Sequence, residues 1–136
     1  MAQLNPYLKF NGNCREAMAF YQQCFGGELT MTVVGESPMA EYMPKEAQSN
    51  ILHSELSIDK LRLFASDMMD GEPRPGNNTA LCFNGTTQDV TEAFTKFSEG
   101  GKVDHPLEKT YFGMFGDLTD KFGISWMFQS DPDPES

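Results

Sequence analysis

YLKFNG, residues 7–12, has a second copy in ALCFNG, residues 80–85, and this repeat decides the expected fold. Each copy precedes a helix-like stretch that ends in two glycines, Gly26-Gly27 and then Gly100-Gly101. Because the order of elements repeats together with the letters, we interpret the chain as one module written twice. The alignment pairs Leu8 with Leu81, Phe10 with Phe83, Asn11 with Asn84 and Gly12 with Gly85.

The residues after the first copy predict a helix that begins after Asn13 and ends at the first glycine pair. Asn13 and Glu16 have the spacing of a capping box, in which each side chain bonds a free backbone N–H of the other residue. Glycine suits the left-handed backbone that commonly ends a helix. The apolar residues recur at helical spacing and should share one face: Ala17, Phe20, Tyr21, Cys24 and Phe25.

The second copy predicts a matching helix. Thr86, with Asp89 three residues later, has the pattern of a helix N-terminus. The stripe that should face the sheet follows at helical spacing: Val90, Ala93, Phe94 and Phe97.

Further strand-like runs follow each helix, so each half has the order βαβββ. We predict an α+β fold in which two such modules form a curved mixed sheet around a cleft. The expected domain covers residues 1–130, with modules at about 1–70 and 78–130, a linker at 71–77 and a disordered tail at 131–136. The runs are TMTVVG, ILHSELSI and KLRLFASD, then KVDHP, YFGMFGDL and ISWMFQS.

Composition and charge exclude several classes of partner. Twenty acidic against ten basic residues give a net charge of −10, which repels nucleic acids and anionic membranes. No apolar run approaches the roughly 20 residues of a membrane helix. The three cysteines form no C-x-x-C pair, which fits reduced thiols and a cytoplasmic location.

Two strings near the ends of the domain carry a resemblance. NPYLKFNGNCREAMAFYQQCFGGEL (5–29) and FGDLTDKFGISWMF (115–128) resemble the PhnB-like subgroup of the vicinal oxygen chelate superfamily. That superfamily includes glyoxalase I, bleomycin- and fosfomycin-resistance proteins and extradiol dioxygenases. The resemblance implies the paired βαβββ fold, but this fold carries several chemistries.

Metal-dependent members of that superfamily bind a divalent ion through His, Gln or Glu from the first and last strands of each module. By resemblance, these positions fall on Tyr7 (Pro6 by an ungapped count), Phe64, Ala80 and Met127. None offers the imidazole, carboxylate or thiolate that such ions prefer. We therefore expect no metal, no cofactor and no glyoxalase activity. The missing G-x-G-x-x-G turn argues against a methyltransferase.

Strand alternation in ILHSELSI places His53 and Glu55 on one face, toward the cleft, and Leu52, Leu56 and Ile58 on the other, toward the helix. The pair has two interpretations. In the functional interpretation, the pair is a general base with its acid partner, or one half of a metal site. In the other interpretation, it is a polar pair that lines a wet groove and has no catalytic role. His105, beside Pro106, is expected to be exposed at a strand end.

The same alternation directs Arg62, Phe64, Cys82 and Met127 into the cleft, alongside Tyr7 and Ala80, while Trp126 faces the helix. We expect the Cys82 thiol to be packed and inert rather than nucleophilic, because no histidine is predicted next to it.

Two segments have two interpretations each. Tyr111, Phe112 and Phe115 either reach the cleft or belong to the core. The segment 36–49, with Met39 and Tyr42, is either a lid or disordered surface.

The predicted function is metal-independent binding of a flat or apolar small molecule, by a homodimeric protein whose cleft is lined by aromatic and methionine side chains. The alternative is a lyase or isomerase that acts through His53 and Glu55, with or without a relocated divalent metal.

Overall fold

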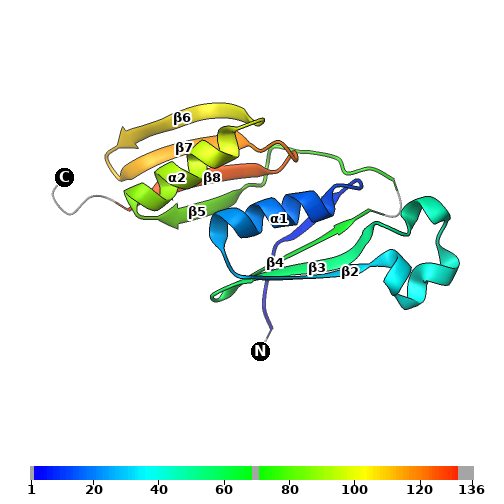
Figure 1. The fold of residues 1–136 in the computed structure, drawn as a ribbon. Coiled ribbons are helices and arrows are strands. Elements are labelled where there is room, and N and C mark those ends of the chain that lie inside the picture. Colours follow the sequence, from blue (N-terminus) through cyan, green and yellow to red (C-terminus); the bar gives the residue numbers. More distant parts are fainter. Residues whose placement is uncertain (1, 69–70, 132–136) are drawn as a thin grey trace. The chain divides into compact units, whose positions relative to one another are not determined.

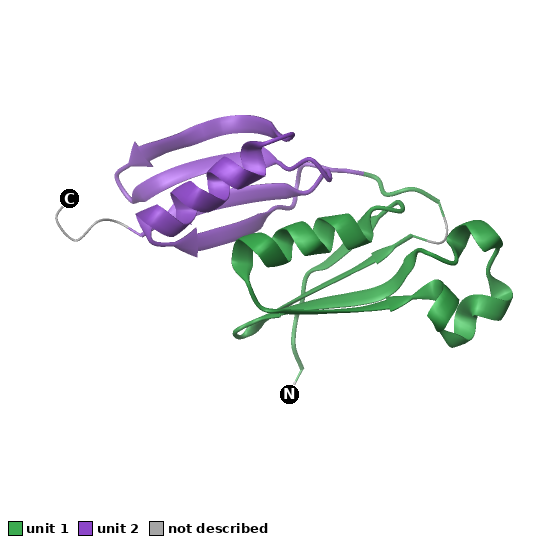
Figure 2. Ribbon diagram, viewed as in Figure 1, with its two compact units in different colours: residues 1–74 green, residues 75–136 purple. Residues whose placement is uncertain are grey.

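The computed structural model describes residues 2–68 and 71–131 of the 136-residue chain. The chain folds into two compact units, residues 1–74 and 75–136 (Figure 2). The expected tail beyond residue 131 lies outside the described residues.

The first unit is a four-stranded mixed sheet with one helix across one of its faces (Figure 1). Its strand order is β1-β4-β3-β2, with β1 parallel to β4 and the other neighbours antiparallel. The elements are β1 (Tyr7–Phe10), α1 (Cys14–Phe25), β2 (Glu28–Val33), β3 (Ile51–Ile58) and β4 (Leu61–Asp67).

The second unit repeats that topology, with strand order β5-β8-β7-β6 and β5 parallel to β8. Two βαβββ modules of the α+β class are therefore confirmed, each with its own open four-stranded sheet. The elements are β5 (Leu81–Gly85), α2 (Thr87–Ser98), β6 (Lys102–Thr110), β7 (Gly113–Thr119) and β8 (Ser125–Ser130).

The core of each unit lies between its helix and its sheet. In the second unit, Phe97 of α2 packs edge-on against Trp126 and Phe128, at centroid distances of 5.0 and 5.5 Å. In the first unit the predicted helix face is partly wrong. Ala17 and Tyr21 are buried as expected, but the other buried positions are Cys14 and Met18, while Phe20, Cys24 and Phe25 are only half-buried.

The start of α1 differs from the predicted capping box, because the Asn13 side chain makes no capping bond. The buried carboxylate of Asp67 at the end of β4 takes that role. One oxygen accepts from the N–H groups of Gly12 and Cys14 at 2.8 and 2.9 Å, and the other from Ile51 at 2.8 Å. Asp67 is only 3% exposed, and these bonds compensate its carboxylate for the loss of water. They also join the β1–α1 turn to β3 and β4.

The cap predicted for α2 is present, because the Thr86 hydroxyl accepts from the Asp89 N–H at 3.1 Å. The segment predicted as a lid or disordered surface is folded. It forms three short 3-10 helices, η1 (Val34–Glu36), η2 (Pro38–Tyr42) and η3 (Lys45–Ala47). The side-chain amide of Gln48, which follows η3, donates to the carbonyls of Ala40 and Met43 at 3.0 Å and so connects this end of the segment to η2.

We expect Asp67→Ala to lower the free energy of unfolding by roughly 2–3 kcal/mol, because two buried N–H groups and one part-buried N–H group lose a charged acceptor. Urea denaturation of the purified variants measures this loss. Glu41→Ala, an exposed acidic residue of η2 in the same unit, is the control and should stay within about 0.5 kcal/mol of wild type. An Asp67→Ala protein as stable as that control would contradict the role given to Asp67.

Candidate functional site

Each sheet has one face under its helix and one face without a helix, called here the open face. In the first unit the residues beneath α1 include Leu8, Phe10, Leu56 and Ala65, all buried. The residues between them therefore lie on the open face.

Three rings meet on the open face of the first unit, one from each of three adjacent strands. They are Tyr7 of β1, Phe64 of β4 and His53 of β3, called here the aromatic triad. The centroid distances are 6.3 Å for Tyr7–Phe64, 5.4 Å for His53–Phe64 and 6.1 Å for Tyr7–His53, with interplanar angles of 34–36°. The strand register explains the meeting, since Tyr7 lies opposite Phe64 across the β1–β4 pair.

Two charged side chains flank the aromatic triad on the same face. Glu55 lies opposite Phe64 in the β3–β4 pair, and Arg62 lies opposite Ser57. Neither forms an ion pair within residues 2–68 and 71–131. Both charges therefore lie beside the rings without a counter-charge among the described residues.

His53 and Glu55 share the open face, as the strand alternation predicted. The His53 ring, however, lies against Tyr7 and Phe64, and no hydrogen bond links it to Glu55 or another carboxylate in residues 2–68 and 71–131. A histidine that acts as a general base usually has a hydrogen-bond partner that fixes its tautomer. The geometry around His53 is thus that of a ring surface rather than of a proton relay.

On the open face of the second unit, the register aligns one residue from each strand in a single row. Cys82 of β5 lies opposite Met127 of β8, Met127 opposite Asp117 of β7, and Asp117 opposite His105 of β6. The structure therefore brings the predicted residues Cys82 and Met127 together. The remaining predicted position, Ala80, is exposed immediately before β5.

His105 and Asp117 form a pair that the sequence analysis missed. Nδ1 of His105 and Oδ1 of Asp117 are 2.8 Å apart. This hydrogen bond, with the attraction of the Asp117 charge, raises the pKa of His105 above its ordinary value of 6.5. His105 is exposed as predicted, but it lies within β6 rather than at a strand end. Pro106 is tolerated there because β6 is a bulged edge strand.

The environment of the thiols argues against nucleophilic roles. All three cysteines are free. The predicted packing of Cys82 is wrong, because the residue is exposed. Partial desolvation still raises the pKa of its thiol, whose Sγ lies 3.5 Å from Oδ1 of Asn84. Burial likewise raises the pKa of Cys14, to about 11. Thiols with raised pKa values carry little thiolate at neutral pH.

The aromatic segment 111–115 does not join the core, so the core interpretation is wrong: Tyr111 is 96% exposed, and Phe112 and Phe115 are half-buried. Phe115 lies on the open face, whereas Tyr111 and Phe112 belong to the turn between β6 and β7. Edge-to-face contacts link Tyr111 to Phe112 at 5.0 Å and Phe112 to Phe115 at 6.0 Å. Trp126 lies beneath α2, as predicted.

The residues present do not fit a divalent metal. Tyr7, Phe64, Ala80 and Met127 hold the positions that the resemblance assigns to ligands. In the part of the chain that the structure describes, no three His, Cys, Asp or Glu residues gather closely enough to hold an ion.

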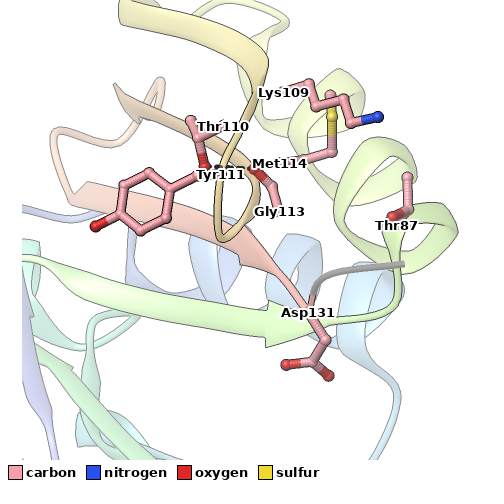
Figure 3. A pocket seen from close by; sticks show the side chains of 7 residues that line it. All are labelled: Thr87, Lys109, Thr110, Tyr111, Gly113, Met114 and Asp131. Carbon is pink, nitrogen blue, oxygen red and sulfur yellow. Dashed lines mark hydrogen bonds between the residues drawn. The ribbon is translucent and has the colours of Figure 1, made fainter. Parts of the chain in front are cut away.

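A separate cavity of about 390 Å³ lies in the second unit, between the start of α2 and the β6–β7 hairpin (Figure 3). Its lining includes the side chains of Thr87, Lys109, Thr110, Tyr111, Met114 and Asp131. No local sequence pattern predicts this cavity, because its residues come from separate elements.

Comparison with known proteins places these features in a family. The model of the Glyoxalase/Bleomycin resistance protein/Dioxygenase superfamily matches residues 3–128. Protein YjdN of Escherichia coli K12 is 32% identical over 137 residues, covering 91% of this chain and 92% of YjdN.

Solved structures show the same fold. Protein PA1353 from Pseudomonas aeruginosa superposes with a TM-score of 0.87 at 35% identity, covering 98% of this chain and 100% of that one. The PhnB protein from Bacillus cereus has a TM-score of 0.75 at 20% identity, covering 95% of this chain and 99% of that one. The fosfomycin resistance protein FosX from Listeria monocytogenes shares the fold alone, with a TM-score of 0.65 at 12% identity. The match covers 97% of this chain and 95% of FosX.

We expect the pKa of His105 to lie above 6.5 in the folded protein and to fall in Asp117→Asn, because the amide removes the charged acceptor. Because the folded-state pKa is raised, the pair stabilises the fold below about pH 6.5, and this contribution disappears as the pH rises through the folded-state pKa. NMR titration of the His105 ring protons measures the pKa. Asp104→Asn is the control and should lower it less. Equal titration in wild type and Asp117→Asn would contradict the assignment.

Proposed function

The chain belongs to the Glyoxalase/Bleomycin resistance protein/Dioxygenase superfamily, and from this premise we propose that it binds a flat small molecule on the open face of its first unit, without a divalent metal. The observation that carries the proposal is the aromatic triad, in which three strands present rings within 6.3 Å of one another. Aromatic side chains bind flat ligands by stacking while covering much apolar area.

Glu55 and Arg62 would orient the ligand on the triad. The carboxylate accepts hydrogen bonds, the guanidinium donates them, and neither is engaged in an ion pair within the described residues. Small-molecule sites commonly combine an apolar surface with a few such polar groups. The preferred ligand is therefore a flat ring system that carries both a donor and an acceptor group.

Metal independence is proposed from the donor atoms. A phenol, a benzyl ring, a methyl group and a thioether at Tyr7, Phe64, Ala80 and Met127 are poor ligands for Zn²⁺, Ni²⁺ or Mn²⁺. These four positions therefore offer no donor set for the chemistry of metal-dependent relatives.

The second candidate is a lyase or isomerase that acts through His53 and Glu55. Their shared position on the open face favours it, since a bound ligand would meet both side chains. The missing hydrogen bond between them makes binding the better-supported function.

We also propose that the two units form one domain, and that the protein is a cytoplasmic homodimer. The reduced thiols agree with that compartment. Among the residues described, no helix has the length and apolar character that crossing a bilayer would need. A monomer in sedimentation velocity at micromolar concentration would contradict the dimer.

We expect a thermal-shift screen of flat aromatic compounds to yield ligands of wild-type protein whose affinity falls about two- to tenfold in Phe64→Ala. Removing one stacking ring loses roughly 0.5–1.5 kcal/mol. Isothermal titration calorimetry measures the affinity. Tyr42→Ala removes a ring that is 77% exposed in η2 and is the control. Ligands that bind wild type and Phe64→Ala equally would place the site elsewhere.

We expect protein purified without a histidine tag to contain far less than one equivalent of metal, even after incubation with Zn²⁺, Ni²⁺ or Mn²⁺. Plasma mass spectrometry measures the content, and ligand affinity should be unchanged by a chelator. One equivalent of bound metal that is lost in His53→Ala would overturn metal independence and favour the enzyme.

A further inference from the structure

Lys9 and Ser66 form the row next to the aromatic triad on the open face of the first unit. They lie directly opposite each other across the parallel β1–β4 pair, as Tyr7 and Phe64 do two residues earlier. Both alternate with residues that are buried beneath α1, so they share the open face. Two residues along a strand span about 6.6 Å, and neighbouring strands lie about 4.8 Å apart. The lysine and the serine are therefore immediate neighbours of the rings.

Both side chains keep their hydrogen-bonding groups available. Within residues 2–68 and 71–131, the Lys9 ammonium enters no ion pair and the Ser66 hydroxyl enters no hydrogen bond. Lys9 is exposed, and Ser66 is half-buried. An ammonium offers three donors and a positive charge, and a hydroxyl adds a further donor. Beside the rings, these two groups suit an anionic oxygen group on a ligand.

The acidic residues around this row leave Lys9 less compensated than Arg62. Glu55 is one strand and two residues from Arg62, about 8 Å between Cα atoms, but two strands and two residues from Lys9, about 12 Å. The Glu55 carboxylate therefore weakens the attraction of an anion to Arg62 more than to Lys9. Asp67, the residue after Ser66, lies on the helix side, where its oxygens accept three backbone N–H groups.

The charge of the whole protein does not decide the sign of the ligand. The net charge of −10 favours cations at a distance, but salt screens exposed charges beyond about 8 Å at physiological ionic strength. At contact, a cationic ligand would meet the Lys9 ammonium, and a neutral ligand would leave it without a partner. A carboxylate provides that partner, and its second oxygen can accept from the Ser66 hydroxyl.

We propose that the open face of the first unit selects flat aromatic carboxylates, with the ring against the aromatic triad and the carboxylate at Lys9 and Ser66. This inference rests on the proposed function, because it uses the same rings, and it adds the chemical class of the ligand. The end of the ligand opposite its carboxylate then lies toward Glu55 and Arg62, which favours a hydroxyl or amino substituent there.

The test is a titration of the ¹⁵N-labelled full chain with benzoate and with benzamide at constant ionic strength. The two probes share the flat ring and differ in the charge of the group that it carries. We expect saturable shifts of the amide signals of Tyr7, Lys9, Phe64 and Ser66, and benzoate binding about two- to fivefold more tightly than benzamide, the range of an exposed ion pair. Added salt should reduce this preference.

Three variants connect the preference to the residues. Lys9→Gln removes the charge but keeps a long polar side chain, and it should lower the affinity for benzoate to that for benzamide. Ser66→Ala should reduce the preference without abolishing it. Lys60→Gln removes the same charge from an exposed lysine in the turn between β3 and β4, and this matched control should keep the wild-type preference.

The outcomes separate this inference from the proposed function. Equal affinities of wild type for the two probes, or a benzoate preference that survives in Lys9→Gln, would overturn the choice of carboxylates. If both probes then still lose affinity in Phe64→Ala, the aromatic triad remains the ring site and the proposed function stands. Absence of shifts at the four amides with either probe at millimolar concentration would overturn both.

Discussion

The buried Asp67 carboxylate is the interaction on which the first unit depends. It fixes the turn after β1 and the start of β3 from the end of β4. Those three strands are the ones that present Tyr7, His53 and Phe64. A carboxylate that is 3% exposed is stable only while its N–H donors stay in place, so the capping of α1 and the geometry of the aromatic triad depend on one group. The second unit uses Asp120 similarly, because it accepts from the N–H groups of Phe122 and Ile124 and from Nε1 of Trp126.

The two units share a topology but differ in what their open faces carry. The first presents three tilted rings beside two charges that form no ion pair among the described residues. The second presents a row of thiol, thioether, carboxylate and imidazole. The helix-covered sides are alike in both units, because packing against a sheet constrains them. Exposed faces have no such constraint and can diverge after duplication.

The fold could be predicted because periodicity and the repeat are local signals. Alternation also placed Leu56 beneath α1, Trp126 beneath α2, and His53 with Glu55 on the open face. The features that were not predicted share a physical cause, because each is formed by residues that are distant in the sequence. The cap of α1 comes from Asp67, 53 residues after Cys14. The His105–Asp117 pair depends on bulges in β6 that change the register. The cavity unites residues from α2, the β6–β7 hairpin and the end of β8.

The distribution of reactive groups argues against covalent catalysis by a cysteine. Covalent catalysis requires a nucleophile within hydrogen-bond reach of a base that a third group orients. His105 has such an orienting group in Asp117, but Cys82 lies three strand spacings away in the same row, on the order of 14 Å at ~4.8 Å per strand. Partial desolvation also raises the pKa of the Cys82 thiol, although the residue is exposed. His53 has ring neighbours instead of an orienting carboxylate. Within each unit, the described residues therefore do not bring a thiol, an imidazole and an orienting carboxylate together, which argues against covalent catalysis by a cysteine.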